Sequence, residues 1–430
     1  MRTFQTVVLL IFGALALLGV FIFATVNSGG SSGIGQVEIW GTIPQEDFDA
    51  LIATVQSERK DFDQVRYTEI EPTIYKKRLL ESFASGAGPD LYLVSQDQVL
   101  SETPRILPIS YDILSVRDFK DAFIEEGELY LIDAGILGLP LTIDPLLMYW
   151  NRDILSQAGI AQPPKFWDEL VALAPKLTVR DGKGNISRST IAFGEYRNVT
   201  NAKEILATLF LQAGDPIVER DAEGKPFVVI DREATSLTAP GPSTLRFYTE
   251  FANPIKTIYS WNRALPTSQK EFLAGDLALY IGFASELSDL RAQNPNLNFD
   301  LAPLPQTRDL KNKLTFGVMQ ALSVSKTSRN PGGAQSAALI LTGDVEIEVL
   351  AAKLGLPPVT RTGLANRPTG GASQLFYDSA LIARGWLDPN PESSNEIFLN
   401  MIEAVTSGKL EISDALGRAG TALAELLRGN

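Results

Sequence analysis

Apolar strand patterns alternate with amphipathic helix patterns near the start of the chain body. Residues 37–40, 65–70 and 91–94 have the composition of strands, the last of them a continuous apolar run, and residues 48–55 and 75–83 carry apolar side chains at helical spacing. A strand–helix–strand–helix–strand order at this spacing predicts parallel pairing, right-handed crossovers and helices on both faces of the sheet. The body therefore begins as an open α/β sheet.

The later part of the chain continues with both kinds of element. Residues 299–304 and 315–324 have strand-like composition, and residues 412–427 form an amphipathic helix pattern. Asp181-Gly182 and Glu223-Gly224 predict hairpin turns. The chain has 430 residues, which is more than one compact domain usually holds, so we expect two lobes.

The charge and the residue types exclude several classes of function. The net charge is −13, from 51 acidic and 38 basic residues, and no dense Lys/Arg stripe is present that would neutralise a phosphate backbone, so nucleic acid is not an expected partner. The chain has no Cys and no His, which excludes disulfides, thiol nucleophiles, Ser-His-Asp triads and the usual zinc sites. Neither a Gly-x-Gly-x-x-Gly nor a Walker-type motif occurs. We therefore expect no cofactor and no metal.

Residues 7–26 form an uncharged apolar run of 20 residues. At 1.5 Å per residue this run matches a bilayer core of about 30 Å, and Arg2 before it predicts that the body faces outward. Residues 27–36 are rich in Gly and Ser, as in a flexible tether. Residues 1–36 are thus expected to be a single-pass membrane anchor with a linker. The alternative is a cleaved signal that leaves a secreted protein, although Ala24-Thr25-Val26 is a poor cleavage site.

Six segments occur in an order that resembles a known family. They are VEIWGT at 37–42, GAGPDLYLV at 86–94, GILGLPLTIDPLLMYWNRDIL at 135–155, AGIAQPPKFWDEL at 158–170, KEFLAGDLALYIGFASEL at 270–287 and LGLPPV at 354–359. In this order they resemble the extracellular solute-binding proteins of the maltose-binding type, the capture subunits of ABC importers. Two departures stand out: Phe166 replaces the usual Thr, and the lipid-modified Cys of many relatives is absent.

The resemblance implies an α/β, two-lobed periplasmic-binding-protein-like fold, with hinge strands and a ligand cleft, after the N-terminal transmembrane helix. Lobe 1 would comprise 37–143 with about 302–345, and lobe 2 would comprise 144–301 with about 346–430. The implied function is capture of a carbohydrate-like solute by lobe closure, with an ABC permease as the membrane partner and no enzymatic activity. With no lipid-modified Cys, residues 7–26 would provide the anchor.

Candidate ligand contacts follow from the rule that open α/β sheets bind ligands beyond the carboxyl ends of their strands. Aromatic rings would stack on sugar rings, and carboxylates, amides and hydroxyls would bind sugar hydroxyls. The candidates are Trp40, Thr42, Gln96, Asp97, Asp144, Trp261, Asn262, Phe283, Ser285, Phe316 and Arg361.

Each of the main candidates also has a purely structural interpretation. Trp40 and Trp261 could instead pack in the lobe cores, and Asp97 could cap a helix. Asp144 precedes a proline, so its role could be limited to shaping a turn. Arg361 could be an ordinary surface charge.

Two alternative functions remain open from the sequence. Asp97, Asp144 or Glu286 could act as the paired carboxylates of a glycoside hydrolase. The same fold could also serve as a surface ligand sensor or attachment module, which would suit a fixed membrane anchor.

Overall fold

The computed structural model describes residues 33–232, 239–308 and 313–429. The predicted membrane span at 7–26 lies outside these residues. Within the described ranges, no helix has the length and apolar character needed to cross a bilayer.

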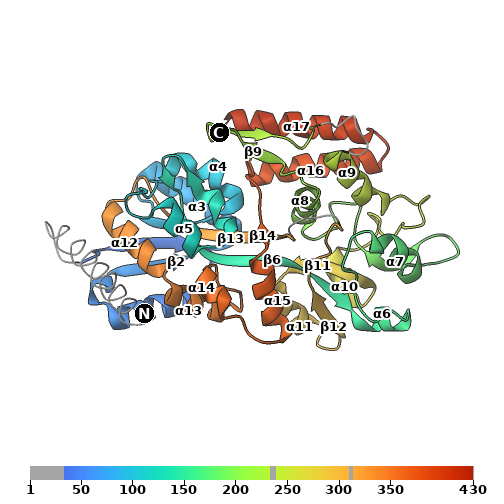
Figure 1. Cartoon of the computed structure of the whole chain (residues 1–430), viewed down its shortest axis with the longest axis horizontal. Coiled ribbons are helices and arrows are strands. Elements are labelled where there is room, and N and C mark those ends of the chain that lie inside the picture. The colour runs from blue at the N-terminus through green and yellow to red at the C-terminus, as the bar shows by residue number, and fades with distance from the viewer. Residues whose placement is uncertain (1–32, 233–238, 309–312, 430) are drawn as a thin grey trace, which may run out of the picture.

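Figure 1 shows the strands and helices of the body. The strands are β1 Val37–Gly41, β2 Val65–Glu69, β3 Leu91–Ser95, β4 Leu131–Ile132, β5 Gly135–Ile136, β6 Leu139–Asn151, β7 Val179–Arg180, β8 Ile186–Ile191, β9 Val218–Arg220, β10 Pro226–Val228, β11 Leu277–Phe283, β12 Phe299–Ala302, β13 Thr315–Val324 and β14 Ala383–Arg384. The α-helices are α2 Gln45–Glu58, α3 Pro72–Ser85, α4 Val99–Glu102, α5 Val116–Ala122, α6 Arg152–Gln157, α7 Glu169–Leu177, α8 Ala202–Gln212, α9 Pro240–Glu250, α10 Ser268–Ala274, α11 Glu286–Gln293, α12 Pro331–Leu341, α13 Asp344–Leu354, α14 Arg361–Ala365, α15 Gly371–Ala380, α16 Pro391–Thr406 and α17 Ile412–Gly429. Short 3-10 turns are η1 Lys60–Phe62, η2 Gln96–Gln98, η3 Thr103–Arg105 and η4 Glu125–Tyr130.

The first three strands pair as the sequence predicts. β1 is parallel to both β2 and β3, with Ile39 opposite Tyr67 on one side and Leu91 on the other. Helix α3 begins with Pro72 in its first turn, where proline needs no hydrogen bond. It ends at Gly86, whose φ of 67° is the left-handed conformation that glycine adopts without strain. The predicted open α/β start is therefore confirmed.

Two long strands connect the two halves of the molecule. The strand order of the main sheet is β2-β1-β3-β13-β6-β11-β8-β7, and β6 runs from one half to the other in Figure 1. Its first part pairs with β13, up to the pairs Val318–Asp144 and Gly317–Pro145. Its second part pairs with β11 and β12. We call the stretch where β6 and β13 pass between the halves the hinge.

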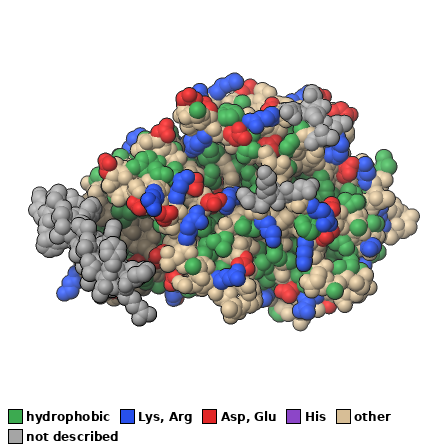
Figure 2. Space-filling view, in the orientation of Figure 1, with side chains coloured by type: hydrophobic (Ala, Val, Ile, Leu, Met, Phe, Trp, Pro, Cys, Tyr) green, Lys and Arg blue, Asp and Glu red, His purple; other side chains and the backbone are tan. Residues whose placement is uncertain are grey.

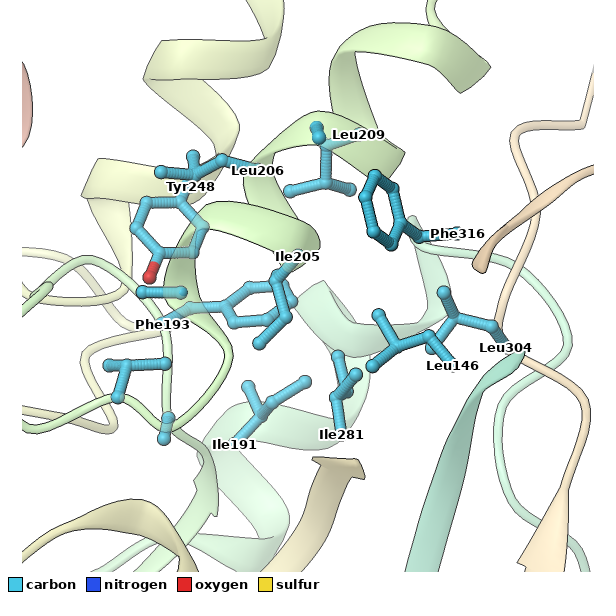
Figure 3. Packing of buried hydrophobic residues seen from close by; sticks show 14 of the residues in the cluster. Leu146, Ile191, Phe193, Ile205, Leu206, Leu209, Tyr248, Ile281, Leu304 and Phe316 are labelled. Atoms are coloured by element: carbon cyan, nitrogen blue, oxygen red, sulfur yellow. The ribbon is translucent and has the colours of Figure 1, made fainter. Parts of the chain in front are cut away.

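The hydrophobic residues form two separate cores, one on each side of the hinge. The first core lies around β1, β3 and the first part of β6, and the second lies around α8, α9 and β11. Figure 3 shows Phe193, Ile205, Tyr248 and Ile281 of the second core pointing toward one another. Two cores joined by shared strands make a two-lobed α/β molecule, as the resemblance implies. We call the halves lobe 1 and lobe 2.

The core in which each residue packs indicates where each lobe begins and ends in the sequence. Ile347 and Leu364 pack in the first core, whereas Leu304 and Phe316 pack in the second. We therefore propose to place about 317–383 in lobe 1 and to extend the middle part of lobe 2 to 316. A third crossing follows at β14, since Ala383 belongs to the first core and the segment after it belongs to the second.

The molecular face in Figure 2 carries acidic and basic side chains that are interspersed rather than gathered by sign. Hydrophobic side chains appear between them in small groups on this face. The chain is acidic overall, with a net charge of −13.

Candidate functional site

Charged side chains from both lobes converge near the hinge. Asp97 comes from lobe 1, while Lys203, Glu204 and Asp388 come from lobe 2, and the Asp97 charge acts on all three. We call these four residues the junction cluster. It contains three carboxylates and one ammonium, which both lobes contribute.

The lobe 1 side of the cluster is the short turn η2, which follows β3. Ser95 and Gln98 form a capping box that fixes this turn. Gln96 is buried, and its side chain donates to the Gly317 carbonyl oxygen at 3.0 Å and accepts from the Met319 amide at 2.7 Å. The turn is thereby bound to the hinge strand β13. The Nε2 and Oε1 atoms of Gln96 thus both bind the backbone of the hinge.

Asp97 follows directly and has an unsatisfied oxygen. Its Oδ1 atom is buried and has no hydrogen-bond partner within the described part of the chain. A buried carboxylate oxygen without a donor is costly, at about 1–3 kcal/mol or more. The site therefore offers a strong acceptor to any hydroxyl or amine that enters.

The lobe 2 side of the cluster contains a buried ion pair. Lys203 Nζ lies 2.9 Å from Asp388 Oδ2 and also donates to the Pro391 carbonyl oxygen and the Ser394 hydroxyl. Burial alone would lower the pKa of Lys203, but the charges of Asp388 and Asp97 outweigh it and the pKa is raised. Because three partners use the three ammonium protons, this lysine has no donor left for a ligand.

Burial raises the pKa of both lobe 2 carboxyls of the junction cluster, those of Glu204 and Asp388. For Glu204 the nearby Lys203 opposes this shift, whereas Asp97 and Asp388 add to it. For Asp388 the Lys203 ammonium and the Ser394 hydroxyl oppose the shift. The charge balance of the cluster is therefore negative, and its open positions are hydrogen-bond acceptors.

The start of α8, which carries Lys203 and Glu204, is held by Glu286. Asn201 precedes this helix in the left-handed conformation, with φ of 60°, which is unusual for a residue other than glycine. Its Nδ2 donates to Glu286 Oε1 at 2.9 Å. Glu286 also accepts from the Phe283 amide, Gln269 Nε2 and the Tyr280 hydroxyl. Four donors thus occupy this carboxylate, and Glu286 positions the helix.

Asp144 lies on β6 at the hinge. Its Oδ1 accepts from the Ser285 amide at 3.1 Å, which ties β6 to the turn after β11. Burial raises the pKa of the Asp144 carboxyl to about 6, although the Ser285 hydrogen bonds oppose that shift. Phe283 ends β11 beside this turn and is partly buried against the second core. Asp144, Phe283 and Ser285 are therefore brought together at the hinge.

Trp40 and Thr42 lie at the carboxyl end of β1, as expected. Trp40 is partly buried, its Nε1 donates to Glu38 Oε1 at 3.2 Å, and the Arg78 guanidinium lies 5.5 Å from its ring centre. The Thr42 hydroxyl accepts from Gln320 Nε2 at 3.3 Å. The Trp40 ring thus already contacts Glu38, Arg78 and the edge of the first core, and only part of it is exposed.

Other candidates lie in the lobe cores or away from the junction. Trp261 is fully buried and donates from Nε1 to Asn198 Oδ1 at 3.2 Å. Asn262 donates to the Tyr259 hydroxyl next to it. Phe316 is buried in the second core, and Arg361 donates to the Lys120 carbonyl oxygen on the side of lobe 1 that carries α5. Trp261 and Phe316 are thus buried in the second core, whereas Asn262 and Arg361 are partly exposed and bind neighbouring groups of their own lobe, so none of the four belongs to the proposed contact set.

Sequence reasoning missed Lys203, Glu204 and Asp388. One signal was available, because Lys203 and Glu204 are charged residues inside the otherwise apolar helix pattern 202–211. Their pairing with Asp388 joins residues far apart in the sequence, which no local pattern reveals.

The lobes also contact each other outside the cluster. Lys76 of α3 lies 3.0 Å from Glu392 of α16. The larger surface hollows lie elsewhere, since two hollows of about 460 and 470 Å³ are lined by residues of lobe 2 around α16, α17 and α9. Within the described ranges, no group of three or more acidic side chains could hold a metal ion. Neither hollow is lined by a residue of the junction cluster.

Solved structures share this architecture over nearly the whole chain. A cyclo/maltodextrin-binding protein complexed with maltotetraose matches with a TM-score of 0.74 and 17% identity, covering 93% of this chain and 98% of that chain. The sugar-binding protein MalE from Xanthomonas citri matches with a TM-score of 0.72 and 19% identity, covering 92% and 98%. These similarities confirm the two-lobed periplasmic-binding-like fold.

Curated relatives match over shorter stretches. A protein of Brucella abortus (strain 2308), whose name gives only a binding role, is 23% identical over 266 residues, which is 59% of this chain and 58% of the relative. The chain thus spans under two thirds of that relative's length. An arabinooligosaccharide-binding protein of Halalkalibacterium halodurans is 30% identical over 111 residues, 24% of each chain.

The family itself is settled by a longer match. Residues 50–369 match the family described as bacterial extracellular solute-binding protein, which is a family of binding proteins rather than of enzymes and implies an extracytoplasmic body. This match covers well over half of the 430 residues. The family resemblance inferred from the six motifs is therefore confirmed, and the chain belongs to the bacterial extracellular solute-binding proteins.

Proposed function

We propose that this protein is the membrane-tethered, extracytoplasmic capture subunit of an ABC importer. It binds a carbohydrate-like solute at the junction cluster, and its two lobes close around that solute. Closure requires contacts to both lobes at once, because a ligand shifts a conformational equilibrium only by binding one state better than the other.

The observation that carries this proposal is the unpartnered oxygen of Asp97. It lies at the carboxyl end of β3, where open α/β sheets bind ligands, and it approaches charged groups of the opposite lobe. A hydroxyl from a bound solute would satisfy it. Glu204 of lobe 2, whose carboxyl feels the charge of Asp97, would be a second acceptor for the same solute.

The carbohydrate class is supported by chemistry and by similarity. Carboxylates accept hydrogen bonds from sugar hydroxyls, and the Trp40 ring at the end of β1 can stack on the apolar face of a sugar. The names of similar proteins include an arabinooligosaccharide-binding protein and one complexed with maltotetraose.

The tether and the permease complete the proposal. Residues 7–26 would provide an anchor of sufficient length. The Gly/Ser-rich residues after them would provide a flexible linker that ends by Ile34, which is buried in the first core and accepts a hydrogen bond from Asn330. The body would remain near its permease while the lobes open and close. Co-purification of the full chain with an integral-membrane transporter would support import, whereas a permease-free surface protein would favour the sensor alternative.

A thermal-shift panel tests the solute class. The full chain, in mild detergent, is mixed with neutral mono- and oligosaccharides, including maltotetraose and arabinooligosaccharides. A true solute at 100 times its dissociation constant stabilises the protein by about 2.7 kcal/mol. Asp97→Ala should lose this shift, and Asp289→Ala, on an exposed face of α11, should keep it. A panel with no shift at all would exclude the carbohydrate class.

A further inference from the structure

A hairpin of lobe 2 reaches across to lobe 1. It consists of β9 and β10, which pair antiparallel with Arg220 opposite Pro226, and β10 packs beside α17. The turn between the strands comes close to the β4–β5 hairpin of lobe 1. A Cβ atom built on Gly224 would lie only 3.4 Å from Asp133 Oδ2. The two hairpins therefore touch without passing through the hinge.

Arg220 at the base of this turn has an unused donor. Its Nη1 donates to the Gly224 carbonyl oxygen at 3.0 Å, which holds the side chain along the turn. Its Nη2 is buried and has no hydrogen-bond partner among the described residues. Burial lowers the pKa of this guanidinium, and the charge of Asp133 opposes that effect. Arg220 thus holds a desolvated positive charge that needs a partner.

Asp133 is the matching partner on lobe 1. It is exposed, it follows β4, and within the described ranges its carboxylate takes part in no hydrogen bond or ion pair. A guanidinium presents paired N–H groups that fit a carboxylate, and such charge-assisted bonds are stronger than neutral ones. A small further approach of the hairpins would let Arg220 and Asp133 pair.

We propose that the β9–β10 hairpin is a strap that locks the closed state when Arg220 pairs with Asp133. The strap acts at a distance from the hinge and makes its contact directly between the lobes. The ion pair would therefore raise the fraction of closed molecules even before any solute binds. This inference rests on the two-lobed closure proposed above, but the experiment below contains no solute, so it can fail or succeed independently of the carbohydrate assignment.

Distance measurement between the lobes tests the strap. The chain has no cysteine, so Lys353→Cys on α13 and Lys176→Cys on α7 place one spin label on each lobe at exposed positions. Pulsed electron paramagnetic resonance on the full chain then reports the distribution of distances between the lobes. Asp133→Asn removes the partner charge at an exposed site and should leave the fold intact.

The variants give a defined pattern. Asp133→Asn and Arg220→Gln should each reduce the closed-to-open ratio by about two- to five-fold, the range for an ion pair at the protein surface. The double variant should reduce it no further than either single variant. Arg232→Gln is the matched control, because Arg232 pairs with Glu219 of the same hairpin at 3.0 Å, within lobe 2. An unchanged distribution in Asp133→Asn, or an equal change in Arg232→Gln, would overturn the strap.

Discussion

Gln96 donates from Nε2 to the carbonyl oxygen of Gly317 over 3.0 Å, so the turn after β3 is joined to a strand that passes between the lobes. The other end of the same amide accepts from Met319. Because Gln96 also precedes Asp97, one buried side chain links the hinge to the proposed solute acceptor.

We expect Gln96→Ala to destabilise the protein by about 2–4 kcal/mol, because it leaves a buried carbonyl and a buried amide of β13 without partners. Urea denaturation of the full chain, followed by circular dichroism, measures this change. Gln293→Ala, at the exposed end of α11, should change stability by less than about 0.5 kcal/mol. Equal stability of Gln96→Ala and the wild type would mean that the hinge does not depend on this amide.

Glu126 should make stability depend on pH. Its carboxyl is buried in lobe 1 against Gly385 of the third crossing, and burial raises its pKa to about 8, although the charge of Arg384 and the Gly385 backbone oppose that shift. Between its ordinary pKa and about 8, the unfolded chain releases this proton and the folded chain keeps it. The free energy of unfolding therefore falls as pH rises through this window, by up to about 1.4 kcal/mol per pH unit, and levels off above it.

Glu126→Gln should remove that part of the pH dependence. The amide is neutral at every pH, so the variant should gain stability relative to the wild type as the pH rises from about 5 to 9. Urea titrations at pH 5, 7 and 9 compare the two proteins. A wild type whose advantage over the variant grows with pH would contradict the buried, protonated state of Glu126.

The two tryptophan candidates should respond differently to truncation. Trp261 is fully buried, so Trp261→Ala should cost about 3–5 kcal/mol through lost burial and a cavity. Trp40 is only partly buried at the end of β1, so Trp40→Ala should cost less stability and instead weaken carbohydrate binding. Denaturation and solute titration of both variants separate the two roles. Equal stability losses would place Trp40 in the core as well.

Local patterns predicted the elements well and the contacts less well. The strands at 37–40, 65–70 and 91–94 and the helices between them follow from the spacing of apolar side chains, which each segment carries by itself. Trp261 looked like a ligand contact because its neighbours are polar. In the fold one of those neighbours, Ser260, donates to the Ile191 carbonyl oxygen inside lobe 2, so the polar segment is buried with its hydrogen bonds made.

The junction cluster illustrates the limit more generally. Asp97 could be predicted because it directly follows a strand whose carboxyl end faces the site. Lys203 and Asp388 could not be predicted as a pair, because their 2.9 Å contact depends on how α8 packs beside the segment before α16. Residues so far apart in the sequence cannot be paired from local sequence patterns.

Isothermal titration of the solute that stabilises the protein most in the carbohydrate panel tests the central claim most directly. The full chain should bind it saturably at one site, Asp97→Ala should weaken the affinity at least about ten-fold, which is about 1.4 kcal/mol, and Asp289→Ala should bind as the wild type does. Equal affinities of the wild type and Asp97→Ala would contradict capture at the junction of the lobes.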